Sequence, residues 1–237
     1  MKLAGGFATL LFLLALPVAL LASNARWLAN DLSFYEQGFA KYGSYQATGL
    51  EKPELDRATG ELIAYFNSNQ DLPNIQVRSG SRTFQLFDQR DSLHLRDVRD
   101  LIQLTYLLQE ISLAYLLVFS AGILLLRKSR PVRALARVWL WGGVFSAVLL
   151  VAIGVAMLVG FDQLFLQFHL VSFSNDLWVL DPATSYLIRM VPEGFFFDLA
   201  VWAAGLALAE AILLAIAGGM LLLALSRQQA KKIGVGA

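Results

Sequence analysis

The 237-residue chain contains no cysteine, and only 16% of its residues are charged. The absence of cysteine excludes disulfides, thiolate nucleophiles, cysteine-ligated zinc and lipid attachment to a cysteine. A formal net charge of +1 leaves no broad basic surface for a phosphate backbone, so we expect no nucleic-acid partner. Any chemistry must therefore use other residue types.

Apolar residues, in contrast, make up 57% of the chain. Ordinary soluble domains contain roughly 45–50% apolar residues, and a soluble fold has no way to cover uninterrupted apolar runs of about 20 residues. The composition therefore excludes a soluble enzyme and predicts an α-helical integral membrane protein.

Four stretches are long and apolar enough to cross about 30 Å of hydrocarbon, and they must do so as helices because backbone groups in lipid hydrogen-bond internally. They are Leu3–Ala22, Leu104–Leu126, Val138–Gly160 and Phe196–Leu225. A cleaved signal peptide is the alternative for the first, since Lys2 precedes it, but its apolar run is long for a signal core. The predicted division is helix 1–22, loop 23–103, helix 104–126, loop 127–137, helix 138–160, loop 161–195, helix 196–225 and tail 226–237.

Lysine and arginine collect in loop 127–137, which has no acidic residue, and in the tail after the fourth span. The residues concerned are Arg127, Lys128, Arg130, Arg133, Arg137, Arg227, Lys231 and Lys232. The positive-inside rule makes these segments, and with them both termini, cytoplasmic. Loops 23–103 and 161–195 then face outward, where we expect them to form a small α+β extracytoplasmic cap.

The first outer loop shows three local signals. Apolar residues at helical spacing after Pro53 predict a helix over Leu55–Phe66. Alternation in Ile75–Arg78 and Thr83–Phe87, around a glycine-containing turn, predicts a hairpin. Asp88 is expected to cap a helix that leads through His94 into the second span.

The second outer loop is less regular. Leu177–Leu180 is interpreted as a short buried strand, and Asp181 followed by Pro182 as the start of a helix that ends near Met190. His169 fits either a helical extension of the third span or a strand opposite Leu177–Leu180.

The chain has two histidines, His94 and His169, one in each outer loop. Histidine is the side chain best suited to move a proton near neutral pH, so two that converge from separate segments would make a site. A spacing of three residues on a helix would bring Asp91 or Asp97 beside His94 to orient its imidazole. The alternative is that each histidine only bonds a backbone carbonyl.

Other catalytic signatures are missing. Two histidines and a carboxylate could hold zinc, but there is no H-E-x-x-H motif and neither histidine has a partner on its own helix face. No G-x-S-x-G motif marks a serine nucleophile. We therefore expect no metal, no cofactor and no acyl-enzyme.

Two further charged residues stand out. Arg189 is the only basic residue of the acidic second loop, so it could bind a lipid phosphate or an oxyanion, or form an ion pair with Asp181 or Glu193. Glu210 lies near the membrane midplane, where an ionisable group is costly. For Glu210 we expect a protonated carboxyl bonded to Tyr115, Ser120 or Ser146 rather than an ion path.

The two histidine-bearing segments resemble one known family. The matching residues are Leu86-Phe87-Asp88, His94-Leu95-Arg96-Asp97-Val98, Phe168-His169, Trp178, Asp181-Pro182, Leu187-Ile188-Arg189 and Pro192-Glu193. Together they are similar to the bacterial lipoprotein intramolecular transacylases, which are four-helix membrane proteins with outward-facing loops. Asp91 stands where that family leads us to expect Glu, and Ser185 where it leads us to expect an acid.

The resemblance implies an enzyme of the bacterial cytoplasmic membrane that acts on its outer face. Its substrate would be a diacylglyceryl-modified lipoprotein, whose sn-2 acyl chain moves to the α-amine of the N-terminal cysteine. We expect His169 to be the general base, completed by His94 with Asp91 or Asp97. Substrate contacts are expected from Arg189, Trp178, Asp181 and Glu193.

Membrane lipids are the other expected partner, and no obligatory protein partner is inferred. The competing hypothesis is a non-catalytic membrane protein whose outer loops bind lipid or a partner protein. Such a protein should tolerate alanine at His94 and His169, whereas an acyltransferase should not.

Overall fold

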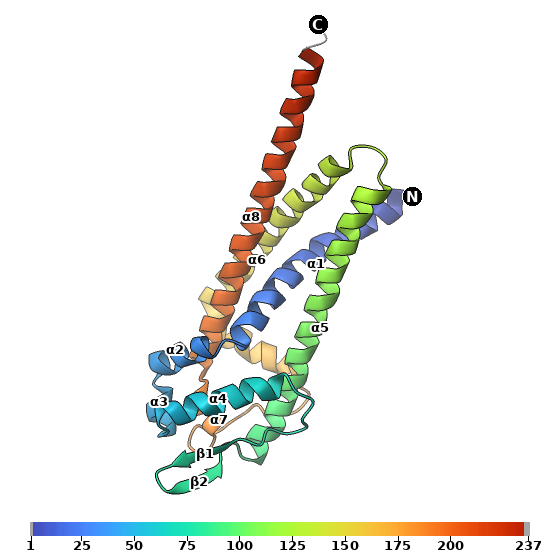
Figure 1. Ribbon diagram of the computed structural model, residues 1–237. Helices are drawn as coiled ribbons and strands as arrows, with labels where there is room; N and C mark the ends of the chain where they lie inside the picture. The colour runs from blue at the N-terminus through green and yellow to red at the C-terminus, as the bar shows by residue number, and fades with distance from the viewer. Residues whose placement is uncertain (1, 235–237) are drawn as a thin grey trace. The chain divides into compact units, whose positions relative to one another are not determined.

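A computed structural model describes the backbone of residues 2–234 and the side chains of residues 6–229. Its elements in chain order are α1 (Lys2–Ala29), α2 (Leu32–Tyr42), α3 (Ser44–Thr48), α4 (Lys52–Phe66), β1 (Gln76–Ser79), β2 (Arg82–Gln85), α5 (Gln89–Leu126), α6 (Pro131–Ser172), α7 (Tyr186–Met190) and α8 (Glu193–Gly234) (Figure 1). The Lys231 and Lys232 side chains used for the predicted orientation lie outside the described residues.

The chain divides into two compact units. The helical unit contains the described residues up to Asn24, Leu107–Val155 and those from Ala203 onward. The cap unit contains Ala25–Tyr106 and Ala156–Trp202. Both units are built from segments that are distant in sequence, because α1, α5, α6 and α8 each contribute residues to both.

Four helices in the described part of the chain are long and apolar enough to cross a membrane, as predicted. They fall within Gly6–Ala29, Gln89–Leu126, Pro131–Ser172 and Glu193–Gln229. Three of these are 37 to 42 residues long, whereas about 20 residues cover the hydrocarbon. The predicted spans therefore occupy only part of each helix, and His94 and Glu193 precede the spans of α5 and α8.

The helical unit packs through close contact between α6 and α8. A Cβ added at Gly143 of α6 would lie 2.5 Å from the backbone oxygen of Ala211, and one at Gly218 of α8 would lie 2.8 Å from that of Ala136. Ala207 and Ala211 are fully buried beside Leu150. Small residues let the backbones approach, which is the usual way helices gain packing energy in lipid.

We predict that Gly143→Ala destabilises the protein by about 1–3 kcal/mol, because the new methyl group overlaps a backbone atom that cannot move alone. The matched control is Gly154→Ala in the same helix, where an added Cβ meets nothing within 4 Å. Thermal unfolding in detergent should show a lower midpoint for Gly143→Ala only. Equal midpoints for the two variants would contradict this packing.

Glu210 has a different partner from those predicted. Its Oε2 accepts a hydrogen bond of 3.0 Å from Nδ2 of Asn24, which also donates to Leu20 O at 2.9 Å. Tyr115 instead donates to Ala8 O, and Ser120 accepts from Trp139. The expectation that Glu210 bonds Tyr115, Ser120 or Ser146 is therefore wrong. The partner is an amide on α1, which packs close to α8. The periodicity of the sequence carries no information about this approach.

The cap unit has its own aromatic core, where α2, α3, α4, α7 and the hairpin lie together (Figure 1). Phe39, Leu55 and Phe195 are buried at its centre. The predicted helix is confirmed as α4, with Pro53 in its first turn. The hairpin is confirmed as antiparallel β1 and β2, which pair Gln76 with Gln85.

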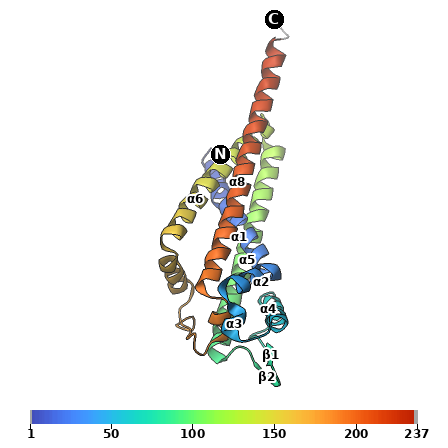
Figure 2. The same cartoon turned by 90° about the vertical axis from the view of Figure 1, so that its left-hand side faces the viewer.

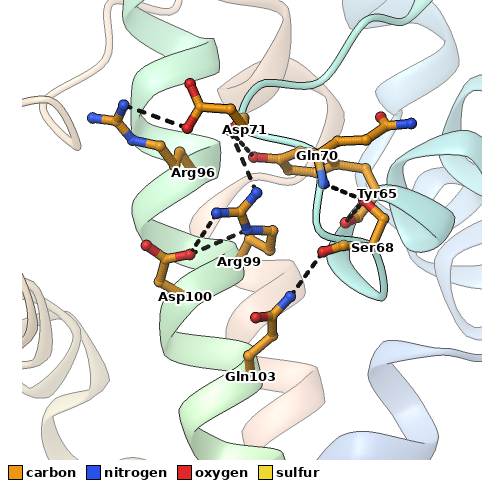
Figure 3. Close-up of polar contacts among 8 residues, drawn as sticks. All are labelled: Tyr65, Ser68, Gln70, Asp71, Arg96, Arg99, Asp100 and Gln103. Carbon is orange, nitrogen blue, oxygen red and sulfur yellow. Dashed lines mark hydrogen bonds and ion pairs between the residues drawn. The ribbon is translucent and has the colours of Figure 1, made fainter.

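Polar contacts tie the segment after α4 to α5 (Figure 3). Gln103 Nε2 donates to Ser68 O at 2.9 Å, and Arg96 forms an ion pair with Asp71 at 3.8 Å. Tyr65 donates to Asp71 O at 3.1 Å. Gln103 and Tyr65 satisfy backbone carbonyls of this segment, and Gln103 and Arg96 hold the segment against α5.

The second loop differs from its predicted structure. Leu177–Leu180 forms no strand, because the donors near it are used locally: Trp178 Nε1 donates to Asn175 O and Val179 N to Asp176 O. The helix begins at Tyr186 rather than Pro182.

The later start has a local cause. Asp181 forms its own turn by accepting from Ala183 N at 2.9 Å, and its carbonyl accepts from Ser185 N at 2.8 Å. Ser185 then caps α7 by accepting from Ile188 N. A turn at Asp181 therefore precedes α7, and the helix begins at Tyr186.

Candidate active site

His94 and His169 meet in the cap unit. His94 lies in the second turn of α5, and His169 lies near the end of α6. His169 is therefore helical and not in a strand, but α6 breaks at Gly160 (φ −160°, ψ 58°), so His169 lies on the part of α6 that follows this break. The two ring centroids are 6.3 Å apart. The two histidines therefore converge from separate segments of the chain.

His169 has a defined tautomer. Its Nδ1 lies 2.7 Å from Phe165 O, and because a carbonyl only accepts, Nδ1 carries the proton. The lone pair is then on Nε2, where a base needs it. The rings of Phe165 at 4.4 Å and Trp178 at 4.9 Å flank the imidazole and hold its plane.

His94 is more deeply buried. Its side chain is 7% exposed, and Nδ1 has no hydrogen-bond partner among the described residues. Burial, together with the nearby His169, lowers the pKa of His94 to about 4. The ring of Phe173 packs edge-on against it at 5.2 Å. His94 is therefore a neutral imidazole at physiological pH.

The two aspartates expected to orient His94 bond elsewhere. Asp91 accepts a 2.6 Å hydrogen bond from Ser185 Oγ, and both side chains are nearly inaccessible, at 1% and 2% exposure. Burial raises the pKa of Asp91. Asp97 accepts from Asn175 Nδ2 at 2.8 Å. Both carboxylates thus join α5 to the second loop, and neither hydrogen-bonds to the imidazole.

The residues expected to contact the substrate differ in their surroundings. Trp178 lies beside His169. Arg189 donates to Ser185 O at 3.0 Å and to Ala47 O at 3.4 Å, and it stacks over Tyr186 at 4.1 Å. The alternative of an ion pair with Asp181 or Glu193 is not found among the described residues. Asp181 shapes its own turn, as described above.

Sequence reasoning missed the aromatic surroundings of the histidines. Phe165, His169 and Phe173 follow one another at intervals of four residues, so Phe165 and His169 share a face of α6 and Phe173 follows directly after the helix ends. That spacing was visible in the sequence and would have predicted an apolar wall around His169. The bond between Asp91 and Ser185 joins residues 94 positions apart and left no such signal.

Comparison with known proteins supports the family directly. The sequence profile of the lipoprotein intramolecular transacylase Lit family matches residues 10–196. The chain belongs to the lipoprotein intramolecular transacylase family. A comparison with curated protein sequences finds no match.

Solved structures show the same fold. The membrane-integral lipoprotein intramolecular transacylase Lit from Bacillus cereus is 20% identical, with a TM-score of 0.73 over 99% of this chain and 100% of that one. Two further structures of the Bacillus cereus protein, which carry substitutions of a histidine by arginine and by alanine, match with TM-scores of 0.73 and 0.72. They cover 94% of this chain and 93% and 94% of their own.

The chain is thus a transacylase enzyme with four membrane helices, and its candidate site has the imidazoles of His94 and His169 at its centre. No group of three metal-binding side chains occurs among the described residues. The chemistry available to these side chains is proton transfer.

The buried His94 predicts a pH-dependent stability for this transacylase. Its pKa in the folded protein lies below the ordinary value of 6.5, so between pH 6.5 and pH 4 the unfolded chain binds more protons than the folded one. Stability is therefore lost as pH falls through this range, by about 2 kcal/mol between pH 7 and pH 5.

Thermal unfolding of the detergent-solubilised protein at pH 7 and pH 5 measures this effect. His94→Phe keeps an aromatic ring but cannot titrate, so its midpoint should fall less on acidification than that of the parent protein. An identical fall in both proteins would show that His94 is not the group responsible.

Proposed function

We propose that the protein moves the sn-2 acyl chain of a diacylglyceryl-modified lipoprotein to the α-amine of its N-terminal cysteine. Family membership supports intramolecular acyl transfer on a lipoprotein. The observation that carries the finer proposal is the pair of imidazoles 6.3 Å apart, one of which presents a free Nε2 lone pair. Such a pair suits a reaction in which the nitrogen that bonds to the acyl carbon loses a proton and the glycerol oxygen that leaves it gains one.

The substrate supplies both reacting groups. Attack of the amine closes a ring through nitrogen, Cα, Cβ, sulfur, two glycerol carbons, the ester oxygen and the acyl carbon. A ring of this size forms readily only if the substrate is held in a near-attack geometry, so positioning contributes much of the rate. A covalent acyl-enzyme would add a step without lowering the barrier.

His169 is proposed as the group that moves the proton. An α-amine has a pKa near 8 and loses a proton as it attacks, while the departing glycerol oxygen gains one. Nε2 of His169 can accept the first proton and return it to the oxygen, because Phe165 O keeps Nδ1 protonated throughout. His94, with its low pKa, stays neutral and supplies a polar surface without repelling the imidazolium.

The residues around the histidines have supporting roles in this proposal. Trp178 packs against His169 and offers a flat surface to the glyceryl ester. Asp91 with Ser185, and Asp97 with Asn175, keep the second loop over α5. Arg189 donates hydrogen bonds to two backbone carbonyls, and we propose that it fixes the conformation of the loop that contacts the substrate.

We predict that His169→Ala lowers the rate of acyl transfer roughly 100- to 10,000-fold, the range for loss of a positioned acid or base. Gln167→Ala, at an exposed position of the same helix, is the control and should leave the rate unchanged. Mass spectrometry of a reporter lipoprotein measures conversion to the N-acyl lyso form. Full conversion by folded His169→Ala would refute the assignment, and loss in His94→Ala alone would transfer the role of base to His94.

We also propose that both termini are cytoplasmic and that the site faces outward, from the clustered lysine and arginine. The chain has no cysteine, so single cysteines give an unambiguous readout. Ser81 in the hairpin turn and Ser129 between α5 and α6 are both exposed.

An impermeant thiol reagent on intact cells should label Ser81→Cys and spare Ser129→Cys. Labelling in permeabilised cells checks that both positions react. The opposite pattern in intact cells would reverse the proposed orientation.

A further inference from the structure

The turn that carries Trp178 has little burial to hold it in place. It belongs to the chain that follows α6, beyond the bend of that helix (Figure 2). Asn175, Asp176 and Val179 are exposed, and Trp178 is only partly buried. Yet the indole of Trp178 stacks on the imidazole of His169 with ring centroids 4.9 Å apart. Since burial supplies little free energy here, polar bonds must fix the turn.

Arg90, the second residue of α5, bridges the two ends of this turn. Its Nε donates to the carbonyl oxygen of Val179 at 3.2 Å, and its Nη2 donates to that of Asp176. A guanidinium presents its donors in a rigid fork, so the two bonds fix the direction of the turn as well as its distance. An ion pair of 3.6 Å with Asp176 Oδ1 adds little, because the Asp176 side chain is 84% exposed.

The turn is also closed by hydrogen bonds of its own. Val179 N donates to Asp176 O at 3.0 Å, and Trp178 Nε1 donates to Asn175 O at 3.0 Å. The indole is thus fixed relative to the turn, and Arg90 fixes the turn relative to α5. A displacement of the turn would therefore carry the indole away from the imidazole.

Arg90 and His94 lie on the same face of α5, because four residues separate them. Phe173, at the start of the second loop, packs edge-on against His94 at 5.2 Å. This face of α5 therefore contacts the second loop both near His94 and at the turn. It carries one imidazole itself and, through Arg90, holds the ring that flanks the other.

We propose that Arg90 is a positioning residue for the acyl transfer, whose guanidinium fork holds Trp178 against His169 and keeps that imidazole aligned. The inference rests on the proposed function, in which His169 moves the proton. Arg90 binds backbone carbonyls and acts only through the turn. The base stays chemically intact without it, so the loss should appear in kcat and not in KM.

Two substitutions separate the fork from the charge. Arg90→Lys keeps the charge but loses the fork, and Arg90→Met keeps little more than the length of the side chain. With a diacylated lipopeptide as substrate in detergent, both should lower kcat about 10- to 100-fold at unchanged KM, the size of effect that a small misplacement of a catalytic group produces. The same substitutions at Arg82, exposed in β2, should leave kcat unchanged.

Fluorine NMR reports the position of the indole directly. In protein labelled with 5-fluorotryptophan, the resonance that disappears in Trp178→Leu belongs to Trp178, and His169→Ala shows where it lies when the imidazole is absent. Arg90→Met and Arg90→Lys should both move this resonance toward that position. The resonances of the other four of the five tryptophans should stay in place, which shows that each variant is folded.

A double-mutant cycle tests whether Arg90 acts through Trp178. If it does, Arg90→Met should lower kcat much less in the Trp178→Leu protein than in the parent protein, because the contact that Arg90 maintains is already lost. Equal factors in the two proteins would mean that Arg90 acts by another route and would overturn the inference.

Three other results bear on the same assignment. Parental kcat in Arg90→Lys overturns it, because the charge alone would then suffice. An unmoved Trp178 resonance in Arg90→Met also overturns it. A parent protein that fails to convert the lipopeptide contradicts the proposed function instead, and the resonance then decides by itself whether Arg90 holds Trp178.

Discussion

The hydrogen-bonding demand of the backbone in lipid is the constraint on which the other features depend. Each span must be helical, and once a helix is formed it continues at little cost into the adjoining region. In this chain α5 and α6 extend well beyond the length that hydrocarbon requires. The extension of α5 carries His94, and the part of α6 beyond its break at Gly160 carries His169, so both imidazoles are held on helices rather than on loops.

Rigid support matters because the proposed reaction gains most from positioning. The imidazole of His169 is fixed by Phe165 O on one side and by aromatic rings around it. Burial fixes the imidazole of His94 and also keeps it neutral by lowering its pKa. A neutral His94 adds no positive charge beside His169.

The second loop is held over the histidines by hydrogen bonds to α5 rather than by regular secondary structure. Asp91 binds Ser185, and Asp97 binds Asn175. Each aspartate carboxyl accepts a hydrogen bond from a neutral donor, so these two bonds attach the loop to α5. Ser185 replaces the acid that the resemblance led us to expect, and a hydroxyl there avoids a second buried carboxyl beside Asp91.

The sequence by itself determined the four spans, α4, the hairpin and the two histidines as site candidates. Each of these depends on periodicity, on turn residues or on the scarcity of titratable groups, which are local properties. It also indicated the family, through short motifs around His94 and His169 that the profile match over residues 10–196 supports.

Only the tertiary structure decided how distant segments pair. It assigned Asn24 to Glu210 and Ser185 to Asp91, and it replaced the expected strand near Trp178 with local turns. The physical reason is the same in each case. A side chain finds its partner by the approach of elements far apart in the chain, and neither helical spacing nor composition carries information about that approach.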